Sequence, residues 1–268
     1  MTMLAWDYTA SATIIIDDTF TAPNDTALVG RMPAPTNVPA AIYAGNGNVS
    51  IVGGFTGGTP YEADVQNNAV RLGSDAGLGL NLGISTPQQF LLSIDFNISG
   101  STQTQANNAH RGAALGFFSS MTIASGGSSH CFNNFTGLTV DRTGSVRLII
   151  GGADSGIFTT LAGFDPATTH TFSFVVDTAG GVGSISNISL DGTSVSLTAP
   201  VNTFSLARTT YAGFYNSSGN IPDLATFDNF FVAIIPEPAN LIGVIGIILV
   251  ACLWEIRNRR LSRDTGKR

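Results

Sequence analysis

Paired carboxyl groups are the side chains of this sequence that come nearest to catalytic chemistry. Glu62 and Asp64 are separated by one residue, and retaining glycoside hydrolysis needs two carboxyl groups about 5 Å apart. The side chains that follow at positions 67 and 68, where a further carboxyl group could stand, are the amides Asn67 and Asn68. An amide serves neither as general acid nor as nucleophile, so the motif is incomplete. A catalytic pair made only of aspartates stays open.

Nucleophilic and metal chemistry is also incomplete in the sequence. No Gly-x-Ser-x-Gly turn accompanies His110, His130 or His170. Cys131 follows His130, but one adjacent pair lacks the spaced ligands of a zinc site. Cys252 lies in an apolar segment near the C-terminus, so we expect no disulfide. We therefore predict that the chain is not an enzyme.

The charge of the chain divides at residue 238. The 268 residues carry a formal net charge of −6, but residues 1–238 hold 6 Arg, no Lys and 16 Asp or Glu, a net charge of −10. Residues 239–268 hold 6 basic and 2 acidic side chains, a net charge of +4. The large acidic region excludes a basic nucleic-acid-binding surface.

An uncharged apolar run lies within the basic C-terminal region. Residues 241–254 contain no charge, and the 18 residues 239–256 would form a helix of about 27 Å, close to the thickness of a hydrocarbon core. The arginines that follow are Arg257, Arg259, Arg260 and Arg263. This order predicts a transmembrane helix with residues 257–268 in the cytoplasm. The alternative is a buried core helix, which would show a polar face, and this segment has none beyond Asn240.

Pro236-Glu237-Pro238 precedes the apolar run, and its two prolines impose an extended, non-helical approach. The motif, the apolar helix and the arginine cluster occur in this order in residues 236–268, which resemble the PEP-CTERM sorting signal of Gram-negative bacteria. The resemblance implies recognition by an exosortase, a membrane-embedded enzyme similar to cysteine proteases, with cleavage near the motif. In this family the Pro-Glu-Pro residues are a recognition element, not catalytic groups.

This resemblance also implies a location. We expect a protein of the cell envelope or extracellular matrix of a Gram-negative bacterium, anchored transiently or permanently in the inner membrane with its C-terminus cytoplasmic. Residues 1–12 end in Ala10-Ser11-Ala12, a small-residue cleavage pattern, but contain no basic region and no long apolar run. We expect them to be the remnant of a signal peptide whose true start lies upstream.

Residues 13–235 consist of short runs of β-branched and aromatic residues separated by turn clusters. The runs are residues 90–98, 113–119, 138–140, 145–150, 170–176, 184–190, 193–197, 210–215 and 225–233. Residues 141–144 and Asp191-Gly192 predict hairpins between neighbouring runs. The pattern predicts an all-β fold, a two-sheet jelly-roll or β-sandwich ectodomain followed by the single C-terminal transmembrane helix.

Three stretches of this region resemble the concanavalin A-like lectin and glucanase (laminin G-like) jelly rolls. They are Asp17-Asp18-Thr19-Phe20, residues 24–28, and Phe227-Asp228-Asn229-Phe230. The resemblance implies a fold that hosts lectins, glycosidases and adhesion modules alike. It also makes Asp18, or its neighbour Asp17, together with Asp228 candidate ligands of a structural Ca²⁺, because first and last strands commonly pair. The alternative is that these aspartates face solvent or cap turns, and we expect no other cofactor.

These observations predict an exported, exosortase-sorted protein that acts as a structural or glycan-associating module of the exopolysaccharide matrix. The expected partners are the exosortase, the membrane and extracellular polysaccharide, with no nucleic acid. Two alternatives stay open. One is an extracellular glycan hydrolase of the laminarinase-like fold, and the other is a permanently anchored surface adhesin that keeps its C-terminal tail.

Overall fold

The computed structural model gives the chain a strand-rich fold. It describes residues 12–23, 26–28, 31–33, 43–47, 63–72, 76–82, 88–98, 112–120, 134–178, 182–205, 210–217 and 225–235. Apart from Ile235, these residues belong to one compact unit, Ala12–Ile234. The elements of regular structure among them are β-strands, numbered β1 to β17 in chain order.

Ten strands form one sheet. Their order is β14 (Thr193–Ser194), β13 (Val182–Leu190), β12 (His170–Asp177), β7 (Gln89–Asn97), β17 (Ala225–Ile235), β5 (Ala69–Leu72), β4 (Ala63–Gln66) and β2 (Thr26–Ala27), with β1 (Thr13–Asp18) paired to β17 and β15 (Val201–Ser205) paired to β13. The pairing of β1 with β17 confirms that the first and last strands lie side by side.

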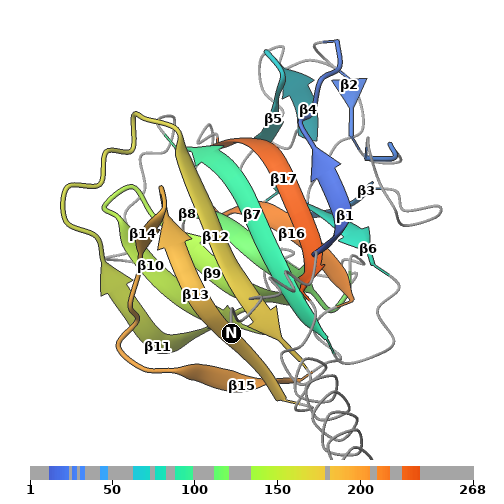
Figure 1. Cartoon of the computed structure of the whole chain (residues 1–268). Coiled ribbons are helices and arrows are strands. Elements are labelled where there is room, and N and C mark those ends of the chain that lie inside the picture. The colour runs from blue at the N-terminus through green and yellow to red at the C-terminus, as the bar shows by residue number, and fades with distance from the viewer. Residues whose placement is uncertain are drawn as a thin grey trace, which may run out of the picture. The chain divides into compact units, whose positions relative to one another are not determined.

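Seven strands form the second sheet. Their order is β11 (Ala153–Thr160), β10 (Ser145–Ile150), β9 (Phe135–Val140), β8 (Gly112–Phe118), β16 (Tyr211–Ser217), β6 (Ala76–Asn81) and β3 (Tyr43–Gly47). Strand pairs in both sheets are antiparallel. Figure 1 shows β13, β12, β7 and β17 side by side in front of β10, β9, β8 and β16. The predicted all-β, two-sheet sandwich is thus confirmed, whereas the expected C-terminal helix lies outside the described residues.

Strict alternation along β7 shows how the core is built. Phe90, Leu92, Ile94 and Phe96 are buried, and the residues between them are partly exposed. Because successive side chains of a strand point to opposite faces, these four side chains enter the space between the sheets. The sequence had predicted this face from residues 94–98.

The seven-stranded sheet has apolar side chains on both faces. In β8, Leu115 and Phe117 belong to the main core between the sheets. Ala114 and Phe118 alternate with them and belong to a separate cluster. The other members of that cluster are Phe135, Ile149 and Tyr215, with Tyr211 packed against them. The second cluster therefore lies on the face of this sheet that points away from the core.

A row of four glycines crosses the seven-stranded sheet. Gly137, Gly116, Gly213 and Gly79 lie directly opposite one another on β9, β8, β16 and β6. They share the outward face with the second apolar cluster, because each alternates with residues of the main core. A Cβ added at Gly213 would lie 2.0 Å from the carbonyl oxygen of Leu78. Glycine is required there by the close approach of neighbouring backbones.

Both predicted hairpins are present. Asp191 and Gly192 have φ of 50° and 75° and connect β13 to β14 in a two-residue turn, as a type I′ turn requires. In the turn between β9 and β10, Oδ1 of Asp141 accepts hydrogen bonds from the backbone N–H of Thr143 at 2.8 Å and of Ser145 at 2.9 Å. Local side-chain chemistry thus sets both turns.

Candidate functional site

An exposed aromatic ring marks the edge of the seven-stranded sheet. Phe158 of β11 is 39% exposed, and the other exposed large apolar side chains of the described residues are not aromatic. Those others are Ile14, Met32 and Val182. Phe158 lies opposite Arg147 of β10, whose guanidinium carbon is 4.7 Å from the centre of the phenyl ring. The two side chains form a cation–π contact.

Arg147 also pairs with a carboxylate. Its Nη1 donates to Oδ2 of Asp154 at 2.9 Å, and the two side chains are 21% and 19% exposed. Oδ1 of Asp154 accepts a hydrogen bond from the backbone N–H of Gly156 at 2.9 Å, which orients the carboxylate. Nη2 of Arg147 donates to none of the described residues. We call Phe158, Arg147 and Asp154 the edge patch.

Local backbone features position the edge patch. Within β11 the pairing register with β10 shifts, and Gly156 in this irregular stretch has a φ of 75°, which favours glycine. On its other side β11 is held by Thr198. The N–H of Thr198 donates to the carbonyl oxygen of Phe158 at 3.1 Å, and its Oγ1 accepts from the N–H of Phe158 at 3.2 Å. The backbone that carries the ring is thus fixed from both sides.

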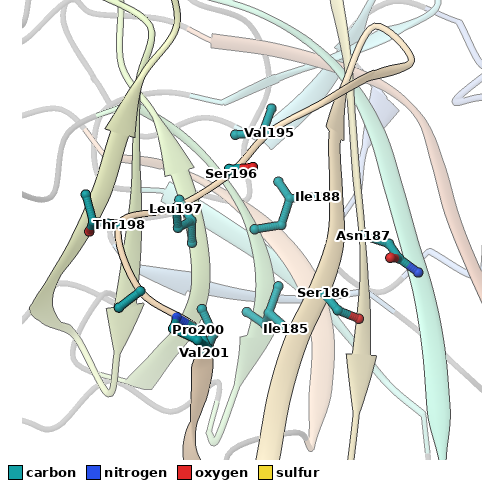
Figure 2. A pocket seen from close by; sticks show the side chains of 11 residues that line it. Ile185, Ser186, Asn187, Ile188, Val195, Ser196, Leu197, Thr198, Pro200 and Val201 are labelled. Carbon is teal, nitrogen blue, oxygen red and sulfur yellow. The ribbon is translucent and has the colours of Figure 1, made fainter.

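The segment that carries Thr198 also forms one wall of a hollow. Residues 195–200 connect β14 to β15, and the N–H of Val195 donates to the carbonyl oxygen of Ile188 at 2.8 Å. The segment therefore ties the edge of one sheet to the edge of the other. Between it and β13 lies a hollow of about 330 Å³. Figure 2 shows Ile185 and Ile188 of β13 pointing toward this segment.

His170 is a buried structural residue at the start of β12. Its side chain lies between the carboxylate of Asp191, 2.7 Å from Nδ1, and the carbonyl oxygen of Asp165, 2.7 Å from Nε2. The imidazole also stacks on Phe164, with ring centres 4.5 Å apart. A second hollow of about 310 Å³ adjoins these side chains. His170 thus joins the loop after β11 to the turn after β13. His110, His130 and Cys131 lie outside the described residues.

The incomplete carboxylate pattern has a structural explanation. Asn67 and Asn68 have φ of 55° and 60° and form the two-residue turn between β4 and β5, in which Gln66 pairs with Ala69. Asparagine tolerates this left-handed conformation better than glutamate does. The position that would carry a third carboxyl group is therefore a hairpin turn. Glu62 lies outside the described residues.

One pair of aspartates does lie together, on the outward face of the ten-stranded sheet. Asp228 and Asn229 interrupt the alternation along β17, because Phe227 before them and Phe230 after them are both buried, and Asn229 has a φ of 51°. Asn229 donates from Nδ2 to Oδ2 of Asp95 at 2.6 Å, and the hydroxyl of Thr171 donates to Oδ1 of Asp95 at 2.5 Å. Partial burial and then the negative charge of Asp95 raise the pKa of Asp228, although a hydrogen bond from the backbone of Asn229 opposes the shift.

Asp18, the other candidate calcium ligand, is buried beside a protein cation. Its Oδ1 accepts from the N–H of Phe20 at 2.9 Å and from Nη2 of Arg31 at 3.2 Å, and its Oδ2 accepts from the hydroxyl of Tyr43 at 2.9 Å. Burial and this carboxylate raise the pKa of Tyr43. No group of three or more His, Cys, Asp or Glu side chains in the described ranges could hold a metal ion. Calcium binding by Asp18 and Asp228 stays a prediction, without support from this arrangement.

The predicted sorting signal lies outside the described residues, including Pro236, Glu237, Pro238 and the arginines after the apolar run. Within the ranges that are described, no helix is both long and apolar enough to span a membrane. The sorting signal in residues 236–268 therefore stays a prediction from the sequence.

No protein-family model matches the sequence, and no curated protein matches it either. Among solved structures, the chain is similar to the carbohydrate recognition domain of Emp47p, with 14% identity, a TM-score of 0.45 and coverage of 84% of this chain and 97% of the other. It is also similar to an endo-1,3-beta-glucanase from Streptomyces sioyaensis, with 13% identity, a TM-score of 0.46 and coverage of 84% and 97%. A third is domain 4 of AbnA, an extracellular arabinanase of Geobacillus stearothermophilus, in complex with arabinotriose, with 14% identity, a TM-score of 0.45 and coverage of 83% and 93%.

The edge patch is the part of the site that sequence reasoning missed. The runs predicted as strands did not include β11, because its first four residues, Ala153 to Gly156, include no β-branched or aromatic residue. The signal that could have found it is the run Ile157-Phe158-Thr159-Thr160, which follows the Gly151-Gly152 turn and is rich in β-branched and aromatic residues.

Proposed function

We propose that this protein associates with extracellular glycans through the edge patch. The observation that supports the proposal is the exposed phenyl ring of Phe158. Its backbone is fixed by hydrogen bonds, and the ring contacts Arg147, which is paired with a carboxylate. An aromatic ring offers a flat apolar surface to the C–H face of a sugar ring. A few polar groups beside such a surface then fix the orientation of the ligand.

The charged pair supplies those polar groups. Nη2 of Arg147 has N–H groups to donate to sugar hydroxyls, and the Asp154 carboxylate retains lone pairs to accept from them. Each sugar hydroxyl both donates and accepts a hydrogen bond, so neighbouring hydroxyls complement an adjacent donor and acceptor. The patch thus combines a surface on which a sugar ring can stack with an adjacent donor and acceptor for its hydroxyl groups.

The test is retention of the full-length chain, in a mild detergent, by gels that contain polysaccharides. The unmodified chain and the Val182→Ala variant should be retarded by the same glycans. Val182 is a matched control because it is an exposed apolar side chain of the other sheet. Phe158→Ala should lose most of the retardation. Equal retardation of Phe158→Ala and Val182→Ala would contradict the proposal.

We also propose that an exosortase recognises residues 236–238 and releases the protein to the cell surface or extracellular matrix. The support is the order of motif, apolar run and arginine cluster in the sequence. Mass spectrometry of the mature C-terminus in the producing cells should find a chain that ends near the motif. A mature protein that retains Arg257 and the residues after it would favour the permanently anchored adhesin instead.

A second candidate function is glycan hydrolysis by Asp95 and Asp228. One observation favours it: the two aspartates lie together on one face of the sheet, where partial burial and then the negative charge of Asp95 raise the pKa of Asp228. Acid–base catalysis by a carboxyl pair uses two groups whose environments differ. Under this alternative the chain releases sugars from a glycan panel. Asp95→Asn and Asp228→Asn would each abolish the release. Glycan binding without release of sugars would favour a glycan-associating module instead of a hydrolase.

A further inference from the structure

The charge of the edge patch limits the class of glycan that it accepts, an inference that rests on the proposed glycan association. Arg147 and Asp154 neutralise each other at 2.9 Å, so the patch has no net charge. Residues 1–238, which include the patch, are acidic as a whole, because they hold 6 Arg and no Lys against 16 Asp or Glu. A ligand that approaches the patch thus meets a negative field without a free cation in the patch.

The arginines elsewhere in the described residues do not change this balance. Arg31 is paired with the buried Asp18, and Arg71 has an interaction of its own. Arg142 is exposed, but it lies in the turn between β9 and β10 and not in the patch. A polysaccharide with a carboxylate on each sugar would therefore find no cationic track among the described residues, and next to Arg147 it would meet the Asp154 carboxylate.

We infer that the edge patch selects neutral polysaccharides and rejects polyuronates. A neutral sugar satisfies both members of the charged pair, with one hydroxyl accepting from Arg147 and another donating to Asp154. Because binding neutralises no charge, its affinity should change little with salt. The discriminating side chain is Asp154, because it cancels the positive charge of Arg147 and repels an anionic ligand.

The test uses the full-length chain in detergent with four polymers: laminarin and dextran as neutral probes, and alginate and polygalacturonate as anionic ones. At least one neutral polymer should retard the chain, to a similar extent in low and high salt, and neither polyuronate should. Retardation by alginate or polygalacturonate that equals or exceeds that by the neutral polymers would overturn the inference but leave glycan association intact. Retardation by none of the four would overturn the inference together with the proposed function for these glycans.

One variant tests the mechanism of selection. Asp154→Asn keeps the acceptor for Gly156 but leaves Arg147 without a counter-charge. Binding of alginate should increase roughly fivefold or more at low salt and fall again at high salt, because screening weakens the new attraction. Asp165→Asn removes the same charge from an exposed loop and should leave alginate binding unchanged. Equal effects of the two variants would overturn the assignment to Asp154.

Discussion

The glycine row across the seven-stranded sheet makes one methyl group at Gly213 costly. An added Cβ would lie 2.0 Å from the carbonyl oxygen of Leu78 and 2.8 Å from the Cα of Gly79, whereas ordinary van der Waals contact begins at 3.4 Å. Both neighbours are backbone atoms of β6, so no flexible side chain can move aside. Strands β16 and β6 would have to separate by more than an ångström, which weakens the hydrogen bonds between them.

The expected loss of stability is the sum of two costs, that of overpacking and that of the weakened hydrogen bonds. Overpacking costs about 1–3 kcal/mol, and a weakened backbone hydrogen bond costs roughly 1 kcal/mol more. We therefore expect Gly213→Ala to lower the free energy of unfolding by about 2–4 kcal/mol, a large part of the stability of a typical domain. Urea unfolding of the full-length chain, followed by circular dichroism of the strands, should show a midpoint lower by more than about 1 M.

The matched control is Gly163→Ala. Gly163 has a φ of 75°, and an added Cβ would meet no atom within 4 Å. Its replacement should cost about 1–2 kcal/mol, from the left-handed backbone alone. If Gly213→Ala is no more destabilising than Gly163→Ala, the close approach of the strands at the glycine row is not real.

The other predictions concern buried and paired carboxylates. Asp18→Asn leaves Arg31 without its counter-ion and should lower the free energy of unfolding, measured in urea, by about 3 kcal/mol. The control Asp17→Asn changes an exposed side chain and should alter the free energy little. Equal losses in the two variants would contradict the ion pair between Asp18 and Arg31. Because Asp18 is paired with Arg31, calcium or EDTA should leave the Tm unchanged. A Tm that rises with calcium would support the predicted calcium site at Asp18. The pKa of Asp228 is raised by its partial burial and then by the charge of Asp95, so the charged form destabilises the fold and Asp228→Asn should be the more stable protein at pH 7. This advantage should shrink as the pH falls through the raised pKa toward 3.8, and a constant difference across that range would contradict the raised pKa.

Much of the fold could be predicted because the strongest strands carry their burial pattern in the sequence. β7 alternates apolar and polar residues, and the turns at residues 141–144 and Asp191-Gly192 have side chains suited to tight hairpins. The all-β class and the two-sheet arrangement followed from such runs. Alternation is a local property of a strand, so it can be read without knowing the partner strands.

The candidate site could not be predicted in the same way. The edge patch depends on the register between β10 and β11 and on Thr198, which reaches β11 from a segment forty residues away in the chain. Asp95 and Asp228 likewise meet only because β7 and β17 are neighbours in the sheet. Contacts of this kind depend on topology. The buried pair of Asp18 with Arg31 shows the same limit, because the two residues are 13 positions apart in the chain and their contact depends on the fold.

The most direct test of glycan association at the edge patch is the ring spectrum of Phe158 during titration with a glycan. The full-length chain is labelled with ¹³C in its phenylalanine rings, and the resonance that is missing from Phe158→Ala identifies Phe158. Stacking of a sugar on the ring predicts that this resonance shifts progressively as the neutral glycan that retards the chain is added. A glycan that binds while the Phe158 resonance stays in place would contradict the proposal that the edge patch is the binding site.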